Sequence, residues 1–302
     1  MAEKRIAVVT GGNKGIGFET CRKLASNGIT VILTARNEKN GSEAVEKLKA
    51  SGLSDLVFHP LDVKDPASIA SLAKFVETNY KKLDILVNNA GESGYTANLE
   101  RLGTIVAEAG AGVDALLNDE NAHLLKGVVV QTHEMAVECL KTNYYGTKRV
   151  TEALLPLLLL SKSARIVNVS SFLGQLVFIH SEEVKAELSN VESLAEEKID
   201  DVVQRFLNDF KDDKLKANGW PLTMAGYKVS KAAINAYTKL MAKKYPNILI
   251  NSVHPGYVQT DINNGAGVLT PEEGARGPAM LALLPDGGPS GRYFNEVQES
   301  DY

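Results

Sequence analysis

"TGGNKGIG", residues 10–17, joins the apolar run "RIAVVT" to the start of the first helical segment. Its glycines follow a Gly-x-x-x-Gly-x-Gly pattern made by Gly11, Gly15 and Gly17. Glycine lets the backbone approach a bound group closely, and a helix N-terminus presents free N–H groups and the positive end of its dipole. Between a strand and a helix, the pattern predicts a site for the pyrophosphate of a nucleotide. A turn used only for tight packing is the alternative, and the spacing is neither Gly-x-Gly-x-x-Gly nor that of a P-loop.

Short apolar runs alternate with longer amphipathic segments along the whole chain. Because strands alternating with helices form βαβ units, we expect an α/β fold, a doubly wound parallel sheet of the Rossmann type. We expect one domain over residues 1–302. Asp65-Pro66 and Thr270-Pro271 have the cap-then-proline order of a helix start. The six expected strands lie in "RIAVVT", "ITVILTA", "DLVFHPLD", "KLDILVNNAG", "RIVNVSS" and "NILINSVHPG".

Two segments interrupt this alternation and are predicted to be insertions, at about 92–134 and about 180–220. The second is acidic and helical, with a predicted capping box at Ser193 and Glu196. Its apolar residues recur at helical spacing and require burial: Ile199, Val202, Phe206 and Phe210. We expect both insertions to form the cover on the substrate side of the domain.

Composition excludes several functional classes. The 302 residues carry a formal net charge of −4, so the basic excess of a nucleic-acid binder is absent. "ALLPLLLL", residues 153–160, is too short to span a membrane and contains Pro156, so we interpret it as a buried helix end. The chain enters a strand at once, and its two cysteines, Cys21 and Cys139, indicate no disulfide framework. We expect a cytoplasmic protein with no nucleic acid and no membrane as partner, and no His-Glu-x-x-His metal site.

The second expected strand ends in "TAR", where an NAD-specific fold would place an acidic side chain for the ribose 2′-hydroxyl. Arg36 could instead bind a 2′-phosphate, with Lys14 of the glycine turn as a second cation. Both could alternatively be solvated surface charges. The pattern favours NADPH over NADH as the cofactor.

The chain resembles the short-chain dehydrogenase/reductase family over nearly its whole length. The resemblance rests on seven motifs in family order: "TGGNKGIG", "LDV" at 61–63, "NNAG" at 88–91, "NYYG" at 143–146, "NVSS" at 168–171, "YKVSK" at 227–231 and "PGYVQT" at 255–260. The extra helices around the active-site serine are similar to the monomeric carbonyl reductase branch. Within that branch, "GGNKGIGFE", "NGWP" and "DGGPSG" resemble the plant reductases of salutaridine and of menthone.

The resemblance implies a role for each matching residue. Tyr227 would be the general acid, Lys231 would hold the nicotinamide ribose, and Asn143 would anchor a water for proton transfer. Ser171 would hydrogen-bond the substrate carbonyl; Ser171 and not Ser170 lies in the family's Ser-x-x-Gly register with Gly174. The resemblance also implies that Tyr227 and Lys231 contact the cofactor. The other implied cofactor-binding residues are Gly11, Asn13, Lys14, Gly15, Ile16, Gly17, Arg36, Asp62, Val63, Asn89, Ala90, Pro255, Gly256, Val258 and Thr260.

Tyr227 and Lys231 lie four residues apart and are therefore neighbours on one helical face. A free tyrosine has a pKa near 10, too high for efficient cycling at neutral pH. We expect the ammonium of Lys231 to lower the pKa of the phenol. Asn89 and Ala90 are expected on the adenine ribose side.

Apolar and aromatic residues near the two insertions suggest a bulky lipophilic ketone as the substrate: Gly94, Tyr95, Phe172, Leu173, Phe178, Trp220, Met224 and Tyr257. A terpenoid ketone such as menthone is the first hypothesis and an alkaloid ketone such as salutaridine the second. Reduction of a conjugated C=C bond is a rival that related plant enzymes achieve after losing the tyrosine. A nucleotide-binding module without turnover is the alternative from another class. We expect a monomer, because the second insertion would cover the face that relatives without it use for assembly.

Overall fold

The computed structural model describes residues 4–98, 100–101, 104–105 and 119–302. Residues 99, 102–103 and 106–118 of the first predicted insertion therefore lie outside the described residues. The strands of the main sheet are β1 (Ile6–Val9), β2 (Thr30–Ala35), β3 (Leu56–Pro60), β4 (Ile85–Asn88), β7 (Arg165–Val169), β8 (Leu249–His254), β9 (Tyr293–Asn295) and β10 (Gln298–Ser300).

These strands form one sheet in the order β10-β9-β8-β7-β4-β1-β2-β3. All neighbours pair in parallel except β10, which runs antiparallel to β9. The chain thus winds outward from β1 in both directions, as a doubly wound fold does. The six predicted strands and the parallel arrangement are confirmed. β9 and β10 were not predicted.

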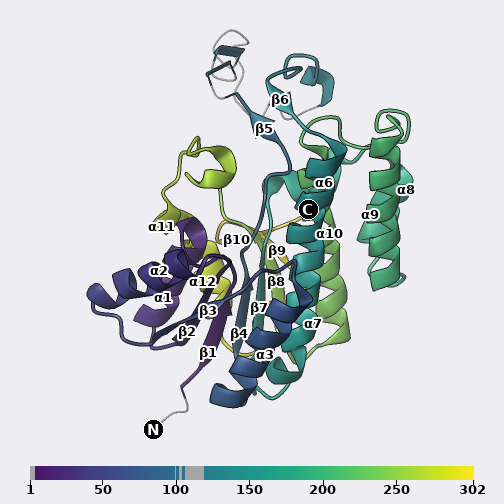
Figure 1. Ribbon diagram of the computed structural model, residues 1–302. Coiled ribbons are helices and arrows are strands. Elements are labelled where there is room, and N and C mark those ends of the chain that lie inside the picture. Colours follow the sequence, from purple (N-terminus) through teal and green to yellow (C-terminus); the bar gives the residue numbers. More distant parts are fainter. Residues whose placement is uncertain (1–3, 99, 102–103, 106–118) are drawn as a thin grey trace.

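Helices cover both faces of the sheet (Figure 1). One face carries α1 (Gly15–Ser26), α2 (Glu38–Ala50), α11 (Pro271–Gly274) and α12 (Arg276–Ala282). The other carries α3 (Pro66–Tyr80), α6 (His133–Leu140), the π-helical turn η2 (Lys141–Gly146), α7 (Thr147–Leu158) and α10 (Ala225–Lys244). Two buried apolar clusters, one on each face of the sheet, form the core.

Sequence signals set several helix boundaries. Asp65 accepts a hydrogen bond from the Ala67 N–H at 2.9 Å, and Pro66 is the first residue of α3. Thr270 and Glu273 form a capping box at the start of α11. "ALLPLLLL" was only partly interpreted correctly: Leu157 and Leu158 are buried, whereas Leu159 and Leu160 follow the end of α7 and are exposed. Within the described part of the chain, no helix is long and apolar enough to cross a membrane.

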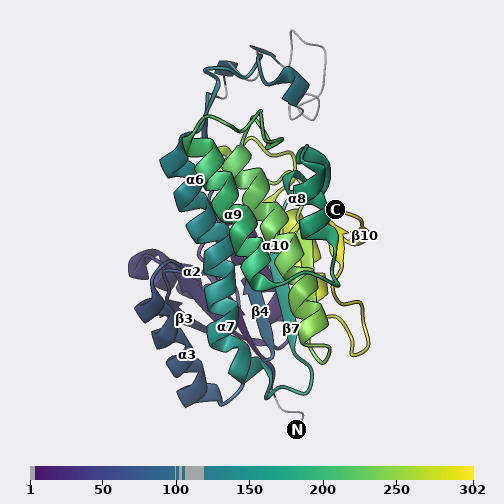
Figure 2. The same ribbon diagram turned by 90° about the vertical axis from the view of Figure 1, so that its right-hand side faces the viewer.

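The second insertion contains α8 (Glu182–Ser189) and α9 (Glu196–Lys211). The predicted capping box is wrong: Ala195 precedes α9 without a side-chain cap, and the Ser193 hydroxyl bonds to the Asn190 carbonyl at 3.5 Å. The helix α9 lies against α10 and α6, on the side away from the sheet (Figure 2). None of residues 180–220 lines the cavity of about 440 Å³ described below.

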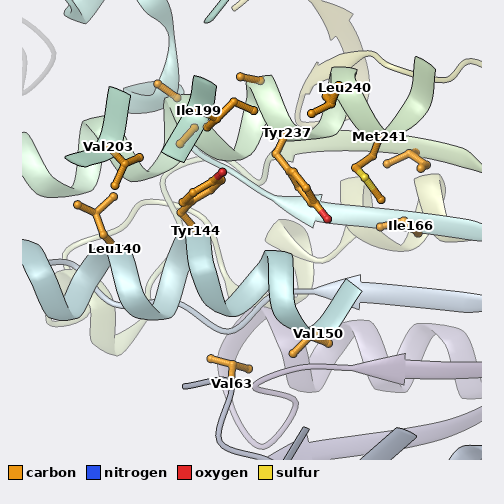
Figure 3. Close-up of a cluster of buried hydrophobic side chains, with 14 of the residues drawn as sticks. Val63, Leu140, Tyr144, Val150, Ile166, Ile199, Val203, Tyr237, Leu240 and Met241 are labelled. Atoms are coloured by element: carbon orange, nitrogen blue, oxygen red, sulfur yellow. The ribbon is translucent and has the colours of Figure 1, made fainter. Parts of the chain in front are cut away.

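The apolar side of α9 completes a cluster around two buried tyrosines, Tyr144 and Tyr237 (Figure 3). Ile199 and Val203 of α9 belong to this cluster and are fully buried. Asp200 adds polar contacts, because its carboxylate accepts from the Tyr144 hydroxyl at 2.8 Å and from the Lys148 ammonium at 2.8 Å. The predicted apolar stripe is therefore buried against the body of the same chain.

The described part of the first insertion lies beyond the carboxyl ends of the parallel strands (Figure 1). It contains a two-stranded antiparallel ribbon, β5 (Thr96–Ala97) with β6 (Val129–Val130), and the short 3-10 helix η1 (Asp119–Asn121). Three further 3-10 helices follow loops near the same edge of the sheet: η3 (Phe172–Gly174), η4 (Leu176–Phe178) and η5 (Asp261–Asn263).

Candidate active site

A cavity of about 440 Å³ opens at the carboxyl ends of the central strands. Ligands of open α/β sheets bind in this position, outside the strand ends. The cavity collects residues from the loops after β1, β2, β3, β4, β7 and β8 and from α10. Every residue predicted for the site lines it except Asn143.

The glycine turn forms part of the wall of this cavity. Gly11 and Gly15 have φ values of 63° and 56°, a left-handed conformation that favours glycine. A Cβ atom at Gly17 would overlap the Gly11 carbonyl oxygen. The first residues of α1 have no side-chain cap, so their backbone N–H groups face the cavity end without a competing side chain. These features fit a bound pyrophosphate.

Asn89 holds the glycine turn in place. Its side-chain amide donates to the Thr10 carbonyl at 2.9 Å and to the Gly11 carbonyl at 3.1 Å. The Thr10 hydroxyl in turn accepts from the backbone N–H groups of Asn89 and Ala90. Asn89 lines the cavity as expected for a residue near the ribose, but its amide supports the turn.

The two predicted phosphate-binding cations lie at the cavity rim and are paired with carboxylates. Arg36 lies 3.5 Å from Glu92, and Lys14 forms an ion pair with Asp261. Both cationic side chains are more than 60 % exposed. Ion pairs this exposed are weak, worth about 0–1 kcal/mol, so a phosphate group could replace the carboxylates at low cost.

Tyr227, Ser171 and Lys231 come together in the wall of the same cavity. Tyr227 lies in the first turn of α10, and Ser171 follows β7. The two side chains are hydrogen-bonded to each other. Lys231 lies one turn further along α10, and its ammonium donates to the Val169 carbonyl at 2.8 Å and lies 5.5 Å from the centre of the Tyr227 ring.

Ser170 and Ser171 differ in their contacts. Ser171 bonds to the Tyr227 phenol and also accepts from the Leu173 N–H at 3.2 Å, while the hydroxyl of Ser170 is buried without a partner in the described part of the chain. Both serines line the cavity, but only the Ser171 hydroxyl has this bond to the phenol.

Burial controls the ionisation of this cluster. It raises the pKa of the Tyr227 phenol above its usual value, although the hydrogen bond from Ser171 acts in the opposite direction. Burial also lowers the pKa of the Lys231 ammonium to about 8. The expected net lowering of the phenol pKa is therefore not seen in this structure, in which burial is the largest influence on that pKa. The phenol remains protonated at neutral pH, which suits a proton donor.

Asn143 lies outside the cavity in the π-helical turn η2. Its side-chain oxygen accepts from the Glu92 N–H at 2.8 Å, and its amide donates to the Glu92 carbonyl at 2.9 Å and to the Ser230 hydroxyl at 3.0 Å. The side chain thus fixes the chain after β4 to the helix that carries Tyr227. Turns of π-helix inside α-helices are frequent at functional sites.

The predicted substrate walls separate into two groups. Tyr95, Leu173 and Tyr257 line the cavity, and the ring of Tyr95 packs edge-on against Tyr227 at 6.4 Å between centres. Gly94 lines an adjoining open recess of about 490 Å³. The remaining four residues do not line the cavity and pack structural elements instead: Phe172, Phe178, Trp220 and Met224.

His254 is a cavity residue that sequence reasoning missed. It ends β8, directly before Pro255, and lines the cavity. Burial, reinforced by the charge of Lys231, lowers the pKa of its imidazole to about 4, so it is neutral at physiological pH. Its position just before the "PG" of a recognised motif was the available signal. Among the described residues, no cluster of three or more metal-ligating side chains occurs, and Cys21 and Cys139 are free and buried.

Comparisons with known proteins show which family and which proteins the chain is similar to. A family model described as "short chain dehydrogenase" matches residues 5–102. The chain is 52 % identical to a (+)-neomenthol dehydrogenase of Arabidopsis thaliana over 308 residues, which cover all of both chains. It is 50 % identical to a (-)-isopiperitenone reductase of Mentha piperita, with 97 % of each chain covered. The solved structure of salutaridine reductase from Papaver somniferum superposes with a TM-score of 0.87 at 48 % identity, covering 97 % of this chain and all of that one.

Proposed function

This chain belongs to the short-chain dehydrogenase family of oxidoreductases, and we propose that it uses NADPH to reduce the carbonyl of a bulky lipophilic cyclic ketone to the alcohol. A terpenoid ketone of the menthone type is the preferred substrate class. The observation that carries the proposal is the hydrogen-bonded pair Tyr227 and Ser171, with Lys231 one helical turn away, in the same cavity as the glycine turn.

The chain's own residues supply the proton and polarise the carbonyl. Tyr227 donates its phenolic proton to the ketone oxygen as negative charge develops there, and the Ser171 hydroxyl donates a hydrogen bond to the same oxygen. The raised pKa of Tyr227 keeps the donor protonated before the reaction. When bound, the reduced nicotinamide supplies the hydride that reaches the carbonyl carbon.

Lys231 and Asn143 support this step from the protein side. The Lys231 ammonium, held by the Val169 carbonyl, lies 5.5 Å from the centre of the Tyr227 ring and would bind the nicotinamide ribose. Since the Asn143 side chain is engaged by Glu92 and Ser230, its backbone in the π-helical turn is the group that would hold a water to return a proton to the site.

NADPH binding is proposed from the rim cations and the glycine turn. Arg36 and Lys14 would exchange Glu92 and Asp261 for the 2′-phosphate, and the N–H groups at the start of α1 would face the pyrophosphate. The other predicted cofactor residues line the same cavity.

The ketone would lie against Tyr95, Leu173 and Tyr257, which give the substrate end apolar walls. The same walls would accept an alkaloid ketone of the salutaridine type, the second candidate for the substrate. The similarity to a protein named (-)-isopiperitenone reductase keeps reduction of a cyclic enone as a rival reaction. Because Tyr227 aims its proton at oxygen, carbonyl reduction is preferred.

The test is NADPH oxidation with a panel of saturated cyclic ketones, cyclic enones and alkaloid ketones, with the products identified by gas chromatography or mass spectrometry. We expect the alcohol as product, and menthone to react at least as well as an enone of the same ring size. A saturated ketone as the main product from the enone, with no turnover of menthone, would identify a double-bond reductase instead. If NADPH binds tightly but is oxidised with none of the compounds, the protein would instead be a nucleotide-binding module without turnover.

Tyr227→Phe tests the assigned proton donor. We expect turnover to fall by about 10²–10⁴-fold, as for loss of a general acid, with the dissociation constant for NADPH nearly unchanged. Tyr237→Phe is the matched control, because Tyr237 is a buried tyrosine of the same helix whose hydroxyl has no hydrogen-bond partner among the described residues. Turnover of the Tyr227→Phe variant equal to that of the control would contradict the mechanism.

A further inference from the structure

We propose that the first insertion holds the start of the catalytic helix, which makes Gln131 and Asp119 positioning residues for Tyr227. The inference rests on the proposed function for its kinetic test. It assigns to this insertion a task in catalysis that is separate from covering the substrate.

The catalytic helix α10 has no cap of its own. Its first residue is Ala225, and the preceding Met224 makes no side-chain hydrogen bond to the helix and has a left-handed backbone, with φ of 49°. Such a conformation is unfavourable for a residue with a side chain and persists only where its surroundings enforce it. Tyr227 is the third residue of the helix and therefore lies in the turn that frays most readily.

Gln131 supplies the missing cap from another part of the chain. Its side-chain oxygen accepts from the Ala225 N–H at 2.7 Å, and its side-chain nitrogen donates to the Leu222 carbonyl at 2.8 Å. One amide thus bridges both sides of the left-handed turn at Met224. Loss of this amide would leave the start of α10 without that support.

Asp119 fastens the same turn from η1. Its carboxylate accepts from the Leu222 N–H at 2.9 Å and pairs with His180 at 2.9 Å. The buried ammonium of Lys228, the residue after Tyr227, lies 3.7 Å from the same carboxylate. Asp119 therefore connects the first insertion to the second insertion and to the first turn of α10.

The amide of Gln131 is itself held rigidly. Gln131 directly follows β6, which pairs with β5, and lies two residues before the start of α6. Helix α6 packs directly on the first turn of α10, where a Cβ at Gly226 would come within 2.8 Å of Ala136. A rigid support on one side of the turn can therefore determine where Tyr227 points.

Lys231 is anchored independently, by its bond to the Val169 carbonyl one turn deeper in α10. Weakening the support at Gln131 should therefore displace the proton donor and leave the cofactor side intact. This separation distinguishes positioning from a general loss of structure.

The experiment compares Gln131→Met with Thr132→Ala. Methionine has nearly the shape of glutamine but neither hydrogen bond, whereas Thr132→Ala removes the neighbouring cap, which serves α6 only. We expect turnover of the ketone to fall by about 10- to 100-fold in Gln131→Met, because displacing a catalytic group by about 1 Å can lower the rate by that factor. The NADPH dissociation constant, measured by fluorescence titration, should change by less than about twofold, and Thr132→Ala should keep wild-type turnover.

Gln131→Glu separates the two hydrogen bonds, because glutamate keeps the acceptor for the Ala225 N–H but turns an oxygen toward the Leu222 carbonyl in place of the amide donor. It should recover only part of the lost turnover. Unchanged turnover in Gln131→Met, an equal loss in Thr132→Ala, or a parallel loss of NADPH binding would overturn the proposal.

Hydrogen exchange of the unmodified protein tests the cap without any substrate or variant. We expect the Ala225 amide to be protected to the same degree as amides in the interior of α10. Exchange as fast as at an uncapped helix end would overturn the proposal even if the variants failed to fold. If the wild-type protein reduced no ketone, the proposed function would fail while this exchange result still decided the capping.

Discussion

Replacing the buried ammonium of Lys231 by an apolar side chain should stabilise the fold while removing function. Lys231 is 3 % exposed, and burial lowers the pKa of its ammonium from 10.5 to about 8. Such a shift means that the charged form is disfavoured in the folded protein by about 3 kcal/mol. Lys231→Met removes this penalty and gives up the hydrogen bond to the Val169 carbonyl, worth about 1 kcal/mol. The free energy of unfolding should therefore rise by about 2 kcal/mol at pH 7.

The gain should depend on pH in a defined direction. Below the folded-state pKa, Lys231 is protonated in both the folded and the unfolded wild type, so the full penalty applies. Between about 8 and 10.5 the folded state has released the proton that the unfolded state still binds, so the wild type becomes more stable as pH rises. The stability advantage of the variant should shrink by about 2 kcal/mol between about pH 7 and about pH 9.5.

Urea unfolding followed by circular dichroism at both pH values measures this effect. Lys231→Arg is the control, because arginine keeps its charge at both pH values and should show no gain. A methionine variant that was less stable than wild type at pH 7, or a gain that did not change with pH, would refute the reasoning from burial.

Three further changes test other parts of the site and fold. Arg36→Leu should weaken NADPH binding much more than NADH binding in fluorescence titrations, and equal effects would show that Arg36 does not contact the 2′-phosphate. Gly17→Ala should lower cofactor affinity by at least about tenfold in the same titrations, because the new methyl group overlaps the Gly11 carbonyl; unchanged affinity would contradict the close packing of the turn. Light scattering should give a mass near 32.6 kDa at all concentrations, because α9 covers α6 and α10, whereas a concentration-independent tetramer would refute the monomer.

The sequence predicted the features that depend on local pattern. The six strands are short apolar runs between turn signals, and the caps at Asp65 and Thr270 use side chains close to the helix they start. β9 and β10 have three residues each and are fixed by pairing with β8 and with each other, so no local pattern marked them.

Site residues that follow strand ends were predictable from the sequence. Properties that depend on the burial of a side chain were less predictable. Tyr95 and Leu173 line the cavity, whereas Trp220 packs against Phe206. An apolar residue that lines a cavity and one that packs in the core cannot be told apart from the sequence. The direction of the Tyr227 pKa shift depends on how completely the phenol is removed from water, which spacing along a helix does not reveal. The cap at Ala225 comes from Gln131, too distant in sequence to be recognised beforehand.

The position of α9 also affects how the protein reaches its active form. The helix is joined through the chain to the α6 and α10 surfaces that it covers, so its local concentration there is fixed by the connecting segments. Dilution cannot remove this covering, whereas a covering supplied by a second copy would dissociate at low concentration. Docking of α9 beside the helix that carries Tyr227 is therefore a first-order step, and its rate constant does not depend on the concentration of the protein.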